Sequence, residues 1–210
     1  MKVLAINGSP KKEGNTYHGL RIALKELEDQ GMETEVLWIG NEKIRGCTAC
    51  NGCRKNRDEK CVLEGDRVNE YIQKMKEADG ILLGSPVYFS SVAGTMKSFL
   101  DRAFFVASGN DGLFRHKVGA GMVAVRRAGG VQAYQQLNTY LNFSEMFVPS
   151  SHYWNVIFGA APGEALQDEE GVQIMEMLGK NMAWLLKSNE QSKDLAKPEK
   201  GQKKKTNMIR

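Results

Sequence analysis

The sequence has no long hydrophobic run. Of its 210 residues, 41% are hydrophobic and 26% are charged, which is ordinary for a globular domain. No apolar stretch approaches the roughly 18 residues of a membrane-spanning helix. The first ten residues carry one lysine and a short apolar stretch, without the small-residue cleavage site of a secretory signal. We therefore expect a cytoplasmic globular protein that meets no membrane.

Two common nucleotide-binding motifs are also missing. The loop that follows the first apolar run, residues 7–16, is NGSPKKEGNT. It contains no GxGxxG, the fingerprint of dinucleotide-binding folds, and no GxxxxGK[ST], the phosphate loop of nucleoside triphosphatases. A ligand at this loop must therefore be held by another arrangement of groups.

The excess of positive charge is confined to the end of the chain. The net charge is +4, and residues 193–210 hold seven basic and two acidic side chains, a net +5, so residues 1–192 carry −1. The triplet Lys203–Lys205 could meet RNA, a lipid surface or an acidic partner, or simply be solvated. The tail has no aromatic residues to stack on bases, so we do not expect nucleic acid as a partner.

Apolar runs alternate with helical patterns five times along the chain. The runs, which predict strands, cover residues 2–7, 35–39, 80–84, 118–125 and 156–158. Helices are predicted between Gly14 and Gly31, with Asn15 or Thr16 as the N-cap, and over residues 66–76, 96–103, 132–146 and 178–186. Because the runs are continuously apolar, they predict a parallel sheet covered by helices on both faces. We predict one α/β domain over 1–187, with a cysteine-rich insert at 41–65 and a basic tail at 188–210.

The first loop has the groups that bind a terminal phosphate. Ligands of doubly wound sheets bind outside the carboxyl ends of the strands, where this loop is expected to lie. Ser9 and Thr16 offer hydroxyls and Asn15 offers an amide. The N-terminus of the following helix adds free N–H groups and a favourable dipole. The alternative is a helix start capped by Asn15 or Thr16, with no ligand.

Two motifs together resemble the flavodoxin-like FMN reductase family. They are GSPKKEGNT at residues 8–16 and GSPVYFSSVAGTMKSFLDR at residues 84–102. The resemblance implies a flavodoxin-like three-layer, doubly wound sandwich with a five-stranded parallel sheet of order 2-1-3-4-5, and FMN bound noncovalently at the sheet edge. It also implies that Ser9, Asn15 and Thr16 hold the FMN phosphate, with Lys11 as a further candidate.

The loop after the third strand is expected at the ring end of the cofactor. Pro86 stiffens its backbone, and Tyr88 and Phe89 offer flat apolar surface to a planar ring. The alternative is a turn with two buried aromatic side chains. The resemblance implies that Pro86, Val87, Tyr88 and Phe89 contact the flavin.

The loop after the fourth strand contains two adjacent glycines. Gly129 and Gly130 allow close approach of the backbone to a ring, and the resemblance implies that this loop closes over the isoalloxazine. Arg126 and Arg127 could receive the phosphate of a nicotinamide cofactor. They could equally be exposed arginines at a strand end.

All four cysteines lie within fifteen residues, as Cys47-x2-Cys50-x2-Cys53-x7-Cys61. A disulfide is not expected in a reducing compartment. Four thiolates can surround a zinc ion or a [4Fe–4S] cluster, or remain free. The segment resembles the compact motif that one branch of the family, the iron–sulfur flavoproteins, carries between the second strand and the next helix.

We interpret the chain as an FMN-dependent oxidoreductase. Electrons would pass from NAD(P)H through the flavin to a quinone, a flavin, a nitro or azo compound, or an iron–sulfur acceptor. The cofactor carries the chemistry, so no catalytic side chain is predicted. The alternatives are an iron–sulfur flavoprotein reduced by ferredoxin and a flavin-free scaffold protein. The resemblance also implies a homodimer or homotetramer. The tail end Thr206–Arg210 contains two apolar residues, from which we predict that it docks on a partner subunit.

Overall fold

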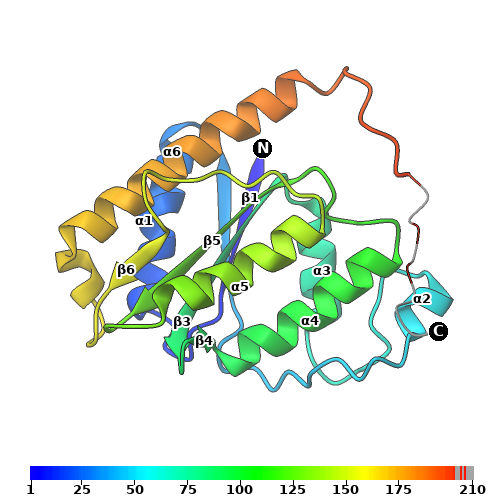
Figure 1. Ribbon diagram of the computed structural model, residues 1–210, viewed down its shortest axis with the longest axis horizontal. Helices are drawn as coiled ribbons and strands as arrows, with labels where there is room; N and C mark the ends of the chain where they lie inside the picture. The colour runs from blue at the N-terminus through cyan, green and yellow to red at the C-terminus, as the bar shows by residue number, and fades with distance from the viewer. Residues whose placement is uncertain (202–203, 205, 207–210) are drawn as a thin grey trace.

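The computed structural model describes residues 1–201, 204 and 206, and its centre is a parallel sheet (Figure 1). The parallel strands are β1 (Lys2–Asn7), β2 (Glu33–Trp38), β3 (Gly80–Tyr88), β5 (Val118–Val125) and β6 (Val156–Phe158). Their order is β2-β1-β3-β5-β6, which confirms the predicted order of the five parallel strands. A two-residue strand, β4 (Ser91–Val92), pairs antiparallel with β3 and was not predicted.

Helices cover both faces of the sheet. One layer consists of α1 (Asn15–Asp29) and α6 (Glu169–Gln191), with the 3-10 turn η1 (Glu164–Gln167) before α6. The other layer consists of α3 (Val68–Glu77), α4 (Gly94–Gly109) and α5 (Gly130–Phe143), with the short α2 (Gly52–Asn56) beside α4. Side chains of β1 alternate between the two cores: Val3 and Ala5 face one, and Leu4 and Ile6 the other. Along the described chain, no helix has the length and apolarity needed to cross a bilayer.

Several elements begin or end at other residues than predicted. β2 starts two residues early because Glu33 and Thr34 pair with the start of β1, although neither is apolar. α5 ends at Phe143 rather than at residue 146, since Glu145 has a left-handed φ of +55°, which an α-helix cannot continue. These differences move the element ends and leave the sheet order unchanged.

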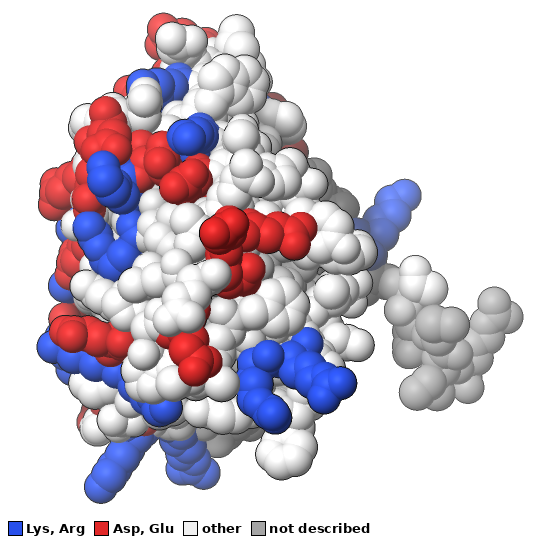
Figure 2. Space-filling model, turned by 90° about the vertical axis from the view of Figure 1, so that its left-hand side faces the viewer, with Lys and Arg blue, Asp and Glu red and all other residues white. Residues whose placement is uncertain are grey.

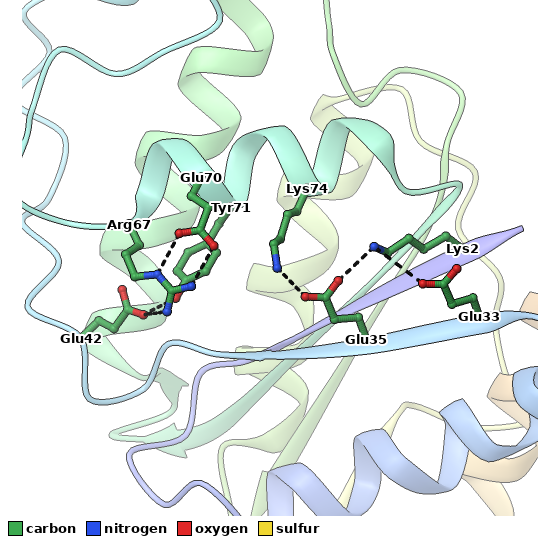
Figure 3. A network of polar contacts seen from close by, with 8 residues as sticks. All are labelled: Lys2, Glu33, Glu35, Glu42, Arg67, Glu70, Tyr71 and Lys74. Atoms are coloured by element: carbon green, nitrogen blue, oxygen red, sulfur yellow. Dashed lines mark hydrogen bonds and ion pairs between the residues drawn. The ribbon is translucent and has the colours of Figure 1, made fainter.

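Charged side chains join α3 to the edge of the sheet, as Figure 3 shows. Glu35 of β2 accepts a hydrogen bond from Lys74 of α3 at 2.6 Å and pairs with Lys2 of β1 at 3.0 Å. A second group of polar contacts lies at the start of α3 and comprises Glu42, Arg67, Glu70 and Tyr71. Exposed ion pairs contribute about 1 kcal/mol or less each. Their charges also protect the free edge of β2 from pairing with another strand.

The described part of the basic tail contacts its own chain. Arg115, in the loop after α4, donates a hydrogen bond to the backbone oxygen of Pro198 at 2.9 Å. The prediction of docking on a partner concerned Thr206–Arg210, and that segment lies outside the described residues apart from residue 206. Within the triplet Lys203–Lys205, only residue 204 is described.

The contact of α1 with α6 makes a stability prediction. A Cβ added at Gly179 of α6 would collide with the backbone oxygen of Ala23 in α1, so Gly179→Ala must push the helices apart. We expect it to lower the free energy of unfolding by about 1–3 kcal/mol in urea denaturation. Gly94→Ala is the control, because nothing lies within 4 Å of its added Cβ. Equal stability of Gly179→Ala and the parent would contradict this packing.

Candidate functional site

The carboxyl end of β1 lies beside the middle of β3. Asn7 pairs with Gly84 in the parallel register, and the Gly8 N–H donates to the Gly84 oxygen at 2.9 Å. β3 extends to Tyr88, past the predicted end at residue 84, so residues 85–88 form the last part of the strand rather than a loop. The loop after β1 therefore meets the segment 85–93, which we call the second loop. Between them opens a cavity of about 260 Å³, which we call the first cavity. Seven residues predicted to bind FMN line it: Ser9, Lys11, Asn15, Thr16, Pro86, Val87 and Tyr88.

One end of the first cavity is the start of α1. The helix has Gly14 as its N-cap, and no side chain caps it. The prediction of a cap at Asn15 or Thr16 is therefore wrong, because the helix begins one residue earlier than that prediction required. Thr16 is buried at this end, and the Ser9 hydroxyl accepts a hydrogen bond from the Lys11 N–H at 3.2 Å. Uncapped N–H groups and the helix dipole favour an anion here.

The side chain of Asn15 holds a distant loop. Its oxygen accepts hydrogen bonds from the N–H groups of Gly163 at 2.9 Å and Ala165 at 3.2 Å. Its amide nitrogen donates to the Ala161 oxygen at 2.9 Å. The loop 159–165 supplies part of the cavity wall. Asn15 therefore shapes the cavity, a role that no local sequence signal indicated, and only one of its amide hydrogens is left for a ligand.

A buried serine fixes the second loop. The Ser85 hydroxyl donates to the Pro86 oxygen at 2.9 Å and accepts from the Ala93 N–H at 3.0 Å. These two bonds tie the beginning of the loop to its end. The wall of the first cavity at Pro86 and Val87 is thereby held in one conformation.

The aromatic side chains of the second loop are accessible. Tyr88 is 49% exposed and lines the first cavity, while Phe89 is fully exposed and is not among the lining residues. The alternative of a turn with two buried aromatics is therefore wrong. Phe89 and Ser90 have left-handed φ angles of +49° and +59°. Such strained conformations in non-glycine residues often occur at binding sites.

The third loop lies between two cavities. Gly129 has a φ of +86°, and a Cβ there would lie 2.7 Å from the Cα of Ser90. The backbones of the second and third loops therefore approach closely. Gly129 and Gly130 line a second cavity of about 320 Å³, and the predicted Arg126 lines the first. Arg127 lies on the second cavity.

Exposed aromatic residues surround this second cavity. Tyr153, Trp154 and Phe158 line it, and each is about half exposed. Figure 2 views the side of the molecule where β6 and the start of α6 lie. Charged side chains gather on one half of that face, and much of the other half is uncharged.

The four cysteines line one small pocket against α4. Cys47 and Cys50 are exposed, Cys53 is buried, and Cys61 is partly buried. Burial, and then the neighbouring Cys61, raise the pKa of the Cys53 thiol. The Gly52 N–H, and then the Thr48 hydroxyl, lower the pKa of Cys50. The fold thus brings together all four predicted ligands.

The donor set of this pocket has the number and kind of ligands that a [4Fe–4S] cluster takes. In the described residues, no three His, Cys, Asp or Glu side chains are arranged to hold one metal ion. A [4Fe–4S] cluster takes one thiolate on each iron, so its ligands surround a volume rather than a point. Four thiols line one pocket of about 10 Å³, so their number matches that requirement, while the space between them in this structure is narrow.

The two thiol environments predict different alkylation rates. In metal-free protein at pH 8, Cys50 has the larger thiolate fraction because its pKa is lowered, whereas Cys53 has a raised pKa and is buried. We expect iodoacetamide to modify Cys50 roughly tenfold faster or more, as measured by peptide mass spectrometry. In denaturant the two rates should converge. Equal rates in the folded protein would show that these environments are wrongly assigned.

Comparisons with known proteins identify the family. The sequence profile described as NADPH-dependent FMN reductase matches residues 1–161. The chain is 38% identical to an iron–sulfur flavoprotein of Methanocaldococcus jannaschii, over 89% of this chain and 98% of that protein. It is 30% identical to an iron–sulfur flavoprotein of Methanosarcina thermophila, over 92% of this chain and all of that protein. RosB, solved with a bound flavin phosphate intermediate, shares the fold with a TM-score of 0.67 at 15% identity, covering 100% of this chain and 97% of RosB. The chain therefore belongs to the NADPH-dependent FMN reductase family and is a flavin-dependent oxidoreductase or electron carrier.

Proposed function

We propose that the protein is an iron–sulfur flavoprotein, with FMN in the first cavity and a [4Fe–4S] cluster at the four cysteines. One observation carries the proposal: the fold gathers the predicted phosphate and ring loops on one cavity and all four thiols on another. The names of the two archaeal relatives support it. A flavin-free scaffold protein would require neither the grouping of these loops nor the grouping of the four thiols.

Within this proposal, each part of the first cavity has a task. Ser9, Thr16 and the N–H groups at the start of α1 bind the phosphate, and Lys11 adds positive charge beside it. Asn15 holds the wall formed by loop 159–165. When bound, FMN supplies hydride and single-electron chemistry.

The ring of the cofactor belongs at the second and third loops. Pro86, Val87 and Tyr88 provide the wall of the cavity, and the exposed Phe89 provides apolar surface at its rim. The close approach of Gly129 to Ser90 brings the third loop to the same rim, and Gly130 follows on the neighbouring cavity. These groups bind and orient the ring and exclude water from it.

The cysteine pocket serves single-electron transfer. Cys47, Cys50, Cys53 and Cys61 hold the cluster, which when bound exchanges one electron at a time. The Ala49 N–H, 3.4 Å from the Cys47 sulfur, adds a hydrogen bond to one ligand. Such hydrogen bonds to sulfur tune the reduction potential of a cluster.

The electron donor distinguishes two versions of the proposal. The family description and Arg126 on the first cavity favour NAD(P)H, since an arginine binds the phosphate of a nicotinamide cofactor well. The acceptor is then a quinone, a flavin, a nitro or azo compound, or an iron–sulfur centre. The four gathered thiols favour ferredoxin as the donor. Anaerobic reduction of the flavin band by NADH, NADPH or reduced ferredoxin decides between them. A homodimer or homotetramer in the cytoplasm remains part of the proposal.

The phosphate site is tested by Thr16→Val. The change keeps the shape of the side chain and removes a hydroxyl from a charged ligand, an interaction worth about 1.5–3 kcal/mol. We expect at least tenfold weaker FMN binding in a fluorescence titration of the apoprotein. Thr139→Val is the matched control, because that threonine is exposed on α5. If the Thr16 variant binds FMN as tightly as the control, the phosphate site is misplaced.

The cluster is tested by four single Cys→Ala variants, at positions 47, 50, 53 and 61. Anaerobically purified parent protein should contain iron, sulfide and FMN. Each variant should lose most of its iron and keep its FMN, because the ligands act together while the flavin site lies at another cavity. Metal analysis with a visible spectrum measures both. A parent that contains flavin and no iron would refute the cluster.

A further inference from the structure

A fully buried arginine lies against the cysteine pocket. Arg102 belongs to α4, and its side chain is 0% exposed. Arginine is almost never fully buried unless its charge is paired. The placement of this cation inside the molecule, on the pocket wall, therefore needs an explanation.

The guanidinium group binds several points of the cysteine segment. Its Nε donates to the Cys61 sulfur at 3.3 Å. Its Nη2 donates to the Leu63 oxygen at 3.0 Å, and its Nη1 donates to the Arg45 oxygen at 3.4 Å. Nη1 also pairs with Asp66, whose side chain is 7% exposed. One side chain thus gathers the residues just before the first cysteine and just after the last.

Asp66 divides its negative charge between Arg102 and the start of α3. The other oxygen of Asp66 accepts a hydrogen bond from the Val68 N–H at 3.2 Å, at the start of α3. The N-terminus of that helix therefore shares the negative charge of Asp66. The Nε–H of Arg102 points instead to the Cys61 sulfur, in a site where little water screens it.

We infer that Arg102 is a positioning residue that holds Cys61 and raises the reduction potential of the centre bound by the four cysteines. This rests on the cluster of the proposed function. Reduction adds one electron, and no bond forms or breaks. A buried cation beside a ligand sulfur stabilises the added negative charge, so its presence favours the reduced state.

The test compares midpoint potentials of the holoprotein in anaerobic redox titrations. Arg102→Met should lower the equilibrium constant for one-electron reduction about tenfold, which corresponds to about 59 mV. Arg102→Lys keeps the charge and should stay close to the parent. Lys55→Met is the matched control: it removes a cation from the same segment, but an exposed one, so solvent screens its effect.

Asp66→Asn separates an electrostatic role from a merely structural one. The amide oxygen can still accept a hydrogen bond from Arg102, while the negative charge is lost, so the potential should rise. If Arg102→Met does not retain iron, the expected rise of the midpoint potential in Asp66→Asn is the result that tests the inference. Shifts of the same sign in both variants, or no shift in a cluster-loaded protein, would overturn the inference alone. A parent that takes up no iron and sulfide refutes the proposed function, and this inference with it.

Discussion

The in-register parallel pairing of β1 with β3 is the constraint on which the candidate flavin site depends. Asn7, the last residue of β1, pairs with Gly84, and β3 continues to Tyr88, so the loop after β1 and the carboxyl end of β3 border the same space. Neither loop forms a cavity alone, because each supplies one wall. Parallel pairing in turn requires helical connections on the faces of the sheet, which explains why the uncapped start of α1 also points to this place.

Helix α4 connects the two candidate cofactor sites. It begins at Gly94, directly after the second loop, whose end is tied to Ser85. Arg102 lies eight residues later, which is about 12 Å along the helix axis, and contacts the cysteine segment. Figure 1 shows the helix running from the region of β4 toward α2. A single rigid element therefore sets the position of the ring loop and of the cysteine pocket.

The sequence predicts those features that depend on local patterns. Continuous apolar runs identified the parallel strands, and two glycine- and serine-rich loops identified the walls of the first cavity. The clamp from Asn15 could not be predicted, because it joins residues that are 146 to 150 positions apart. Gly129 and Gly130 line the second cavity rather than the first, and Gly129 lies against Ser90 between the two. Which cavity the third loop lines depends on how α5 packs against β6, and no local sequence pattern specifies that packing.

Asp101 and Arg102 show why burial is difficult to predict at the level of single residues. Neighbours on a helix point about 100° apart. Asp101 accordingly pairs with Lys97 at 2.7 Å, near the surface, while Arg102 enters the interior. The cysteine segment has little regular structure of its own, and its backbone oxygens need donors when it packs against α4. A cation with five N–H groups can satisfy several of them at once. Because Arg102 is buried where it satisfies these backbone oxygens, water does not screen its positive charge beside Cys61.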